Sequence, residues 1–293
     1  MSAGVVAPHR LAHRLLPAFH ALRHFAAERF PPWATAPMAA LLYAAPASLG
    51  HPGPLEAAGG VLATFLGFLC LRIADDLEDL GHDRVFHPRR GLCSGRIDPA
   101  RLRDANLALA SALVVLESSS HWRLAFLAGA CAFYAAWYAY GKARVHTVAR
   151  PFLTNLVFPC AVLHGAGPAA WRAAVPLALY AWLVAVAHEF AHNVRSVEED
   201  TRSGPGYARV LGTRGTAVLS AALFTAATLA VLFLWQILAR PRAFGLVIAV
   251  AGAGLGFFLA RLLREPGARH ARALYRAGIL FGLAPALGLL LPR

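Results

Sequence analysis

Long apolar segments separated by short polar connections form the main pattern of this chain. Helices that cross a bilayer need roughly 17–25 apolar residues, and nine segments approach this length. They lie near residues 33–49, 55–75, 103–117, 122–141, 151–169, 173–192, 215–238, 243–262 and 273–291. The pattern therefore predicts an all-α fold, an integral membrane bundle of about nine transmembrane helices with polar loops capping its inner face.

The segment before the first span has a different pattern. Residues 11–28 alternate apolar with Arg and His positions, which predicts an amphipathic helix lying in the inner interface. We expect no cleavable signal peptide, because an apolar h-region is missing from this stretch. With no linker or low-complexity segment, we expect one membrane domain over 1–293: the amphipathic segment 1–32 followed by the bundle 33–293.

Composition supports the membrane prediction. Hydrophobic residues make up 58% of the chain and charged residues 15%, whereas soluble domains are typically about 45–50% apolar. In a soluble protein a net charge of +13 would suggest nucleic acid, but here it follows the positive-inside rule. The connections expected outside hold only Arg172, Arg240 and Arg242. We therefore expect a lipid bilayer and no nucleic acid as partner, with a cytoplasmic N-terminus and an outside C-terminus.

The four cysteines are dispersed and form no C-x-x-C pair. This spacing indicates neither a zinc site nor a disulfide framework.

Acidic residues concentrate in two short stretches that each close an apolar run. Carboxylates at a membrane edge repel one another and are costly to desolvate, so such groups usually serve a function. A divalent cation with oxygen ligands offsets this repulsion. The pattern therefore predicts a metal–phosphate site at the membrane surface. Its members are Asp75, Asp76, Glu78, Asp79 and Asp83 in the first stretch, and Glu189, Glu198, Glu199 and Asp200 in the second.

In the first stretch, helical spacing puts Asp76, Asp79 and Asp83 on one face. Mg²⁺ is usually held by one or two carboxylates together with substrate phosphates, so this spacing suits a site that binds diphosphate through metal ions. The alternative is a solvated helix end with a run of charge. The stretch follows the apolar segment 59–74 and lacks alternating lysine partners, which favours the metal site.

Helical spacing recurs in the second stretch, where Glu189, Asn193, Ser196 and Asp200 follow one another at i, i+4, i+7 and i+11. All four side chains can face one cavity, with Glu199 close by. The alternative is an ordinary helix C-terminus followed by a loop.

Lys142 is the only lysine of the chain and follows Tyr138 by four residues, so the two share a predicted helical face. An ammonium group is a compact charge suited to a phosphate oxygen. The alternative is a lysine that snorkels to the interface. The arginine-rich loop 84–96 is a second source of positive charge for the same anion.

A rival interpretation comes from the string HEFAH, in which His188, Glu189 and His192 match the H-E-x-x-H pattern of zinc proteases. The match sits at the end of an apolar span, and no third ligand follows at a diagnostic distance. An intramembrane zinc protease stays open as an alternative, although it leaves the first acidic stretch and Lys142 without a role.

Taken together, these motifs resemble the UbiA superfamily of intramembrane prenyltransferases. Residues 75–83 match its first motif, N/D-D-x-x-D-x-x-x-D, in full, and Tyr138-x-x-x-Lys142 matches a Y-x-x-x-K element. The loop after the first motif is similar to an Arg-Pro-Leu-x-x-Gly stretch in which Gly91 replaces the proline. The second motif departs from D-x-x-D-x-x-x-D: Asn193 and Ser196 stand at the first two acidic positions and only Asp200 keeps its carboxylate, with Glu189 and Glu199 as candidates to compensate.

The resemblance implies a Mg²⁺-dependent intramembrane prenyltransferase. Such an enzyme ionises an allylic polyprenyl diphosphate and transfers the prenyl group to a hydrophobic or aromatic acceptor. The implied catalytic residues are Asp76, Asp79, Asp83 and Lys142. The metal candidates are Asp75, Asp76, Asp79, Asp83, Glu189, Asn193, Glu199 and Asp200, and the diphosphate candidates are Lys142, Arg90, Arg84, Arg29, Tyr138 and Arg195.

Two further functions stay open at this point. The same fold supports membrane-bound terpene cyclases, in which a double bond of the substrate captures the cation. From another class, a transporter or scaffold with vestigial motifs is a non-catalytic alternative.

Overall fold

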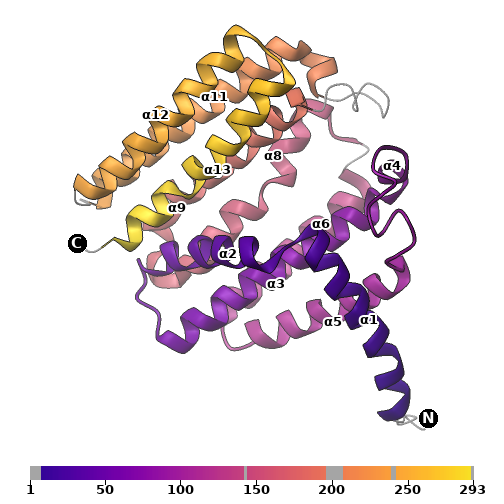
Figure 1. The fold of residues 1–293 in the computed structure, drawn as a ribbon. Helices are drawn as coiled ribbons and strands as arrows, with labels where there is room; N and C mark the ends of the chain where they lie inside the picture. Colours follow the sequence, from indigo (N-terminus) through magenta and orange to yellow (C-terminus); the bar gives the residue numbers. More distant parts are fainter. Residues whose placement is uncertain (1–7, 142–143, 196–206, 239–241, 292–293) are drawn as a thin grey trace. The chain divides into compact units, whose positions relative to one another are not determined.

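The computed structural model describes residues 8–141, 144–195, 207–238 and 242–291, and these ranges contain helices and no strand (Figure 1). The α-helices are α1 (Pro8–Arg29), α2 (Pro32–Ala47), α3 (Pro54–Glu78), α4 (Leu80–Phe86), α5 (Pro99–Glu117), α6 (His121–Ala136), α8 (Arg150–Thr154), α9 (Val157–Arg195), α11 (Tyr207–Leu238), α12 (Arg242–Arg264) and α13 (Ala268–Leu290). A π-helix η1 (Trp137–Gly141) follows α6, and a 3-10 helix η2 (Thr147–Ala149) precedes α8.

The apolar segments of the sequence lie on these helices, so the predicted fold class is confirmed. Six helical stretches of the described chain are long and apolar enough to cross a bilayer, which makes this a multi-pass integral membrane protein. The number nine stays a prediction. Predicted spans one and three correspond to α2, which has only 16 residues, and to the less apolar α5.

The fifth and sixth predicted spans form a helical hairpin. The indole Nε1 of Trp182 donates a hydrogen bond to the backbone oxygen of Phe152 at 2.8 Å. Thirty residues of straight helix would hold these groups about 45 Å apart, so the chain reverses between them. The reversal includes Gly167, whose φ of 67° and ψ of 178° are open only to glycine.

The chain divides into two compact units, and the first comprises residues 1–40 and 61–119. Its core contains Phe25 of α1, Ile73 of α3 and Leu102 of α5, all fully buried. Leu92 and Ile97, from the loop 87–98 between α4 and α5, join the same cluster. The loop is therefore anchored by apolar burial at two points, and its polar residues are held close to the helices.

Local chemistry ends this loop and starts α5. The Asp98 side chain accepts a hydrogen bond from the backbone N–H of Ala100 at 2.8 Å, and Pro99 occupies the first turn. An Asp cap satisfies a backbone donor that lacks a helical partner, and proline loses nothing at the first helical position.

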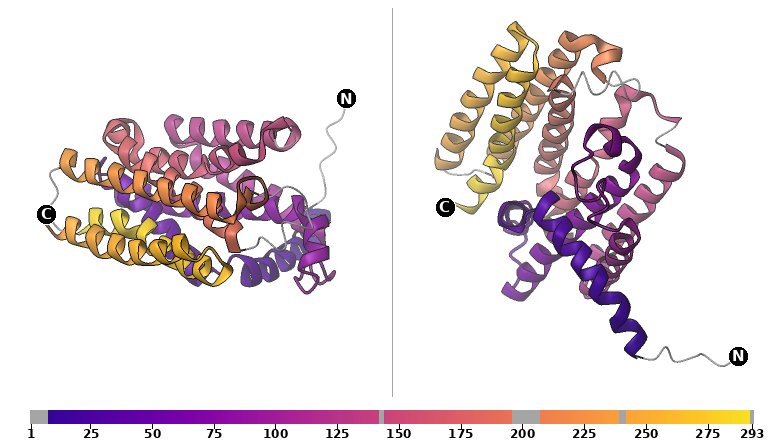
Figure 2. Two further views of the ribbon diagram at one scale, coloured as in Figure 1. Left: turned by 90° about the horizontal axis from the view of Figure 1, so that it is seen from above. Right: turned by 45° about the vertical axis from the view of Figure 1, so that its right-hand side comes forward.

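The second unit comprises residues 41–60 and 120–293. Within it α11 packs along α9, and α12 forms a hairpin with α13 (Figure 2). Small residues let the helices approach closely: the hydroxyl of Ser220 on α11 donates to the backbone oxygen of Ala187 on α9 at 2.8 Å. Phe244 and Phe281 fill the core between the hairpin and its neighbours.

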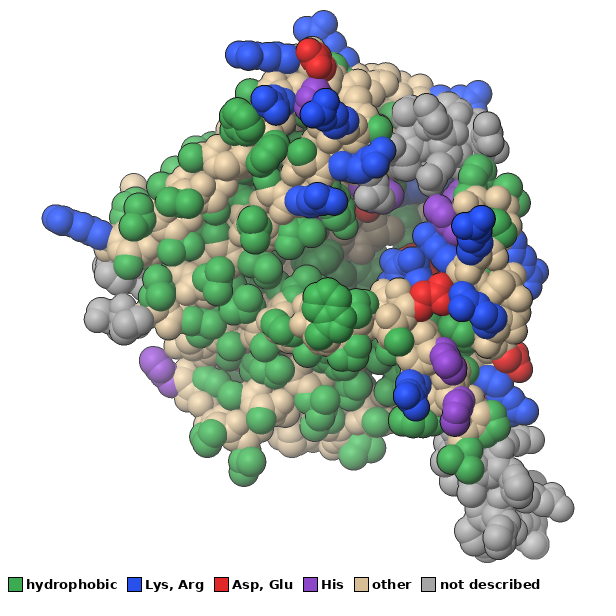
Figure 3. Space-filling model, viewed as in Figure 1, with side chains coloured by type: hydrophobic (Ala, Val, Ile, Leu, Met, Phe, Trp, Pro, Cys, Tyr) green, Lys and Arg blue, Asp and Glu red, His purple; other side chains and the backbone are tan. Residues whose placement is uncertain are grey.

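The outer face of α11, α12 and α13 is apolar. Leu229, Val250 and Leu280 are 64%, 66% and 69% exposed, and hydrophobic side chains cover most of this face (Figure 3). Arginines gather instead at the end of the hairpin that holds the connection between α12 and α13 (Figure 3). An apolar flank with a basic end is the surface expected of helices surrounded by lipid.

Candidate active site: a carboxylate and arginine pocket

The first acidic stretch lies where α3 gives way to α4. α3 ends at Glu78, and Asp79 occupies the turn before α4. Backbone bonds from Asp79 N to Asp75 O and from Asp83 N to Asp79 O, both 2.9 Å, carry the helical path across the turn. Asp76 and Asp83 are consequently two turns apart on one side of this path, and both are buried.

Two arginines neutralise the Asp76 carboxylate. Arg29, the last residue of α1, donates from Nε to Oδ2 at 2.7 Å and from Nη2 to Oδ1 at 3.1 Å. Arg72, one turn earlier on α3, donates from Nη2 to Oδ1 of the same carboxylate at 2.7 Å. Charge-assisted bonds of this kind are about twice as strong as neutral ones, so the buried Asp76 is held in a fixed position.

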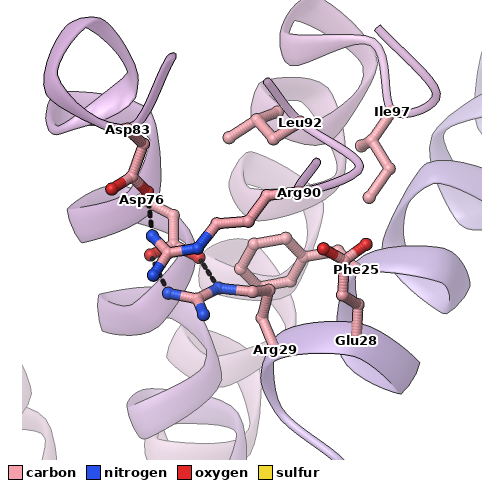
Figure 4. A pocket seen from close by; sticks show the side chains of 8 residues that line it. All are labelled: Phe25, Glu28, Arg29, Asp76, Asp83, Arg90, Leu92 and Ile97. Carbon is pink, nitrogen blue, oxygen red and sulfur yellow. Dashed lines mark hydrogen bonds and ion pairs between the residues drawn. The ribbon is translucent and has the colours of Figure 1, made fainter. Parts of the chain in front are cut away.

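Asp83 has an arginine of its own. Arg90, in the loop 87–98, forms an ion pair with the Asp83 carboxylate through Nη1. Both ion pairs face one pocket (Figure 4). Its wall is lined by Phe25, Glu28, Arg29, Asp76, Asp83, Arg90, Leu92 and Ile97.

The pocket combines alternating charges with an apolar floor. Its open space is about 10 Å³, which is roughly the room needed by one water molecule. Anything larger would have to move the guanidinium groups off the carboxylates. The carboxylates and guanidinium groups of these ion pairs could each bind the opposite charge of a ligand that carries both a cation and an anion.

Comparison with known families identifies the family of the chain. The model of the UbiA prenyltransferase family matches residues 35–283. This chain belongs to the UbiA prenyltransferase family. The predicted resemblance is confirmed, and the chain is an intramembrane prenyltransferase. This activity in the membrane implies a prenyl diphosphate substrate and a lipid bilayer as partner. The zinc-protease and non-catalytic alternatives lose their support.

Solved structures agree on the fold. One, described as giving insights into digeranylgeranylglyceryl phosphate synthase in membranes, is 17% identical, with a TM-score of 0.71 over 95% of this chain and 99% of the other. The apo structure of a UbiA homolog from Aeropyrum pernix K1 is 16% identical, with a TM-score of 0.71 over 87% of this chain and 98% of the other. A search of curated proteins finds no match.

The structure brings together four of the predicted site residues in one pocket: Asp76, Asp83, Arg29 and Arg90. Other predicted members of the first unit lie outside the pocket lining. Asp75 is half-buried beside Arg72 at 3.4 Å, Asp79 is half-buried in the turn, and Arg84 is exposed on α4.

Sequence reasoning missed the apolar residues that line the pocket and two charged residues at or beside it, Glu28 and Arg72. Arg72 precedes Asp76 by four residues, and that helical spacing was a usable signal for an ion pair. Glu28 gave no comparable signal, because its partner is the backbone N–H of Gly91, 63 residues later.

In the second unit, Tyr138 lies in the π-helix η1 and is half-buried, with its ring centroid 6.5 Å from that of Tyr134. π-helical turns are frequent at functional sites. Lys142 lies outside the described residues, so the face that it was predicted to share with Tyr138 stays a prediction.

Part of the second acidic stretch is described. Glu189 is half-buried on α9, and Asn193 is buried with its Oδ1 accepting a hydrogen bond from the backbone N–H of Ala208 at 3.3 Å. Asn193 thus ties the end of α9 to the start of α11. Arg195 is the last residue of α9, while Glu199 and Asp200 lie outside the described residues.

In the HEFAH string, His188 packs against aromatic side chains and a glycine. The His188 ring lies 4.9 Å from that of Tyr275 and 5.7 Å from that of Phe224, measured between centroids. A Cβ on Gly278 would come within 2.1 Å of His188 Nε2, so a glycine is required beside the imidazole. Among the residues that the structure describes, no three His, Cys, Asp or Glu side chains gather closely enough to hold a metal ion.

Proposed function

We propose that the chain ionises an allylic polyprenyl diphosphate with the help of Mg²⁺ and transfers the prenyl group to a hydrophobic or aromatic acceptor. The observation that carries the proposal is the pocket itself: buried Asp76 and Asp83 face it together with Arg29 and Arg90. Carboxylates suit a divalent cation and guanidinium groups suit phosphate oxygens, so one site offers partners to both halves of a metal–diphosphate ligand.

The donor set fits Mg²⁺. Asp76 and Asp83 present hard carboxylate oxygens, and Mg²⁺ is commonly bound by one or two carboxylates plus phosphates and water. When bound, the ion supplies neutralisation of the charge that develops on the leaving diphosphate. We assign Asp76, Asp79 and Asp83 to this role, with Asp75 beside them.

The arginines then change partners. Arg29 and Arg90 are paired with Asp76 and Asp83 in this structure. With a cation held by the carboxylates, these guanidinium groups would be available to direct their paired N–H donors at phosphate oxygens, where bidentate geometry is favourable.

The remaining site assignments rest on the family motifs. We assign Lys142, Tyr138, Arg84 and Arg195 to the diphosphate, and Glu189, Asn193, Glu199 and Asp200 to a second metal ion. A single membrane domain over 1–293, with a cytoplasmic N-terminus and an outside C-terminus, completes the proposal.

A second candidate function is a membrane-bound terpene cyclase. One observation favours it: Asn193 stands at the first acidic position of the second motif, and its amide oxygen accepts a hydrogen bond from the backbone N–H of Ala208. An oxygen used in this way is a weak candidate for a metal ligand. A reduced second motif would suit a reaction that needs no separate acceptor.

The test is diphosphate release by the purified protein from a panel of labelled prenyl diphosphates with Mg²⁺, followed by analysis of the extracted products. We expect Asp76→Ala and Asp79→Ala each to lower the rate of diphosphate release by 100-fold or more, which corresponds to about 3 kcal/mol of transition-state stabilisation. Exposed Glu265, at the connection between α12 and α13, provides the matched control Glu265→Ala. Full activity in both aspartate variants would remove the first motif from catalysis, and a product formed without acceptor identifies a cyclase.

A further inference from the structure

The loop 87–98 carries Arg90, and an unusual contact holds this loop. The backbone N–H of Gly91 donates to both carboxylate oxygens of Glu28, at 2.9 Å and 3.0 Å. Glu28 comes from the last turn of α1, so the contact joins segments that are 63 residues apart. Gly91 is the position at which the similar family stretch has a proline, and proline has no N–H to donate.

Packing around Gly91 is as restrictive as its hydrogen bond. A Cβ at this position would lie 2.7 Å from Oε2 of Glu28 and 2.8 Å from Cδ1 of Ile97. Ile97 is buried in the core of the unit and cannot easily yield. A side chain at residue 91 would therefore push the Glu28 carboxylate away, which explains why glycine accompanies glutamate here.

Further contacts close the loop around this point. Ile97 N donates to Gly91 O at 2.9 Å. Arg96 donates from Nη2 to the backbone oxygen of Arg89 at 2.9 Å and lies 3.7 Å from Oε2 of Glu28. The Glu28 carboxylate thus balances Arg96 while it holds Gly91.

Glu28 and Arg29 act on the two sides of one pocket. Arg29 binds Asp76 of α3, and Arg90 pairs with Asp83 (Figure 4). Glu28 accepts the hydrogen bond of Gly91, the residue next to Arg90. We infer that Glu28 is a positioning residue: through the Gly91 N–H it fixes the loop so that Arg90 reaches the diphosphate site. The role of Arg90 in this inference rests on the proposed function.

The loop contains its own reporter. Cys93 is half-buried two residues after Gly91, and Cys160 on α9 provides an internal reference in the second unit. The rate of maleimide alkylation at each cysteine is measured by mass spectrometry of peptides, with the full-length protein in detergent. Because a hydrogen bond to a carboxylate is lost, we expect about tenfold faster alkylation of Cys93 in Glu28→Ala and Gly91→Pro, and an unchanged rate at Cys160.

Two variants guard against a simple folding defect. Glu28→Gln keeps one acceptor oxygen, so Cys93 should react at a rate between those of wild type and Glu28→Ala. The double variant Glu28→Ala/Gly91→Pro should react no faster than either single variant, because all three lose the same bond. Additive rates in the double variant would overturn the inference.

Turnover supplies the readout that a structural contact alone would not move. We expect Glu28→Ala to raise KM for the prenyl diphosphate severalfold and to leave kcat within about twofold, because uniform binding is lost rather than chemistry. Unchanged Cys93 rates overturn the inference, and so do faster rates with an unchanged KM. A wild-type protein that releases no diphosphate defeats the proposed function instead, while the alkylation results still decide whether Glu28 holds the loop.

Discussion

The hydrogen bonds to the Asp76 carboxylate depend on the planar shape of the arginine guanidinium group. Arg29 donates two parallel N–H bonds to this carboxylate, at 2.7 Å and 3.1 Å, and Arg72 adds a third from the preceding turn of the same helix, α3. A single point charge cannot reproduce this fork. The pocket therefore depends on arginine as a shape and not only as a charge.

Replacing Arg29 by lysine tests that dependence. When Arg29 turns to the diphosphate as proposed, a lysine there keeps the charge but makes one charge-assisted bond to the phosphate oxygens in place of two, a loss worth about 1.5 kcal/mol or tenfold. We expect Arg29→Lys to lower kcat/KM for the prenyl diphosphate by about tenfold, as measured by diphosphate release. The matched control is Arg103→Lys on α5, where the side chain is exposed and no change is expected. Equal losses in the two variants would contradict a geometric role for Arg29.

Cys93 offers a prediction on pH dependence. Burial raises the pKa of its thiol above the ordinary value, and the nearby Asp83 carboxylate raises it further against the opposing charge of Arg90. A raised pKa means that less of the reactive thiolate is present at any pH below it. Alkylation of Cys93 should therefore reach half of its limiting rate at a higher pH than alkylation of glutathione. A midpoint equal to or below that of glutathione would contradict this prediction.

Single residues also show what sequence can reveal about the site. Asp76, Asp83, Arg29 and Arg90 were predicted because a spaced motif and a family resemblance name them. Arg72 follows from i, i+4 spacing alone. Glu28 was out of reach, because its partner is a backbone N–H from a distant segment, and backbone groups carry no sequence signal.

At the scale of elements, hydropathy located the helices well because burial in lipid leaves a long apolar run for each of them. It did not find α4, which has only seven residues and contains His82, Asp83 and Arg84, so it forms no long apolar run. Apolar content also did not reveal that the backbone at Tyr138 forms the π-helix η1. Such a one-residue change of helical pitch depends on tertiary packing and not on apolar content.

Gly167 carries a prediction about the hairpin of the fifth and sixth predicted spans. Its φ of 67° and ψ of 178° lie in a region that costs other residues about 1–3 kcal/mol. Gly167→Ala should therefore lower the midpoint of thermal unfolding. Gly129→Ala is the matched control, because Gly129 lies inside α6 with open space around its Cβ position and alanine favours helix. A midpoint for Gly167→Ala that equals or exceeds that of the control would contradict a strained reversal at this residue.

At the scale of the whole molecule, charge and span number make a joint prediction about orientation. Arg261, Arg264, Arg269 and Arg272 are exposed around the connection between α12 and α13, where Glu265 is the only acid. The positive-inside rule puts this end in the cytoplasm. Since α13 is the last helix, its far end and the C-terminus should then lie outside, and an odd number of spans follows if the N-terminus is cytoplasmic.

Reporter fusions separate these outcomes. Alkaline phosphatase, which is active only outside, should give activity when fused after residue 293 and none when fused after residue 266, whereas a fluorescent protein that folds only inside should show the reverse. The physical reason is that each Arg held on the outer side would oppose the membrane potential and the insertion bias for cytoplasmic cations. Fluorescence from the C-terminal fusion would show that the last hairpin has the opposite orientation. The arginine-rich connection would then lie outside, which would contradict the proposed cytoplasmic location of the inner loops.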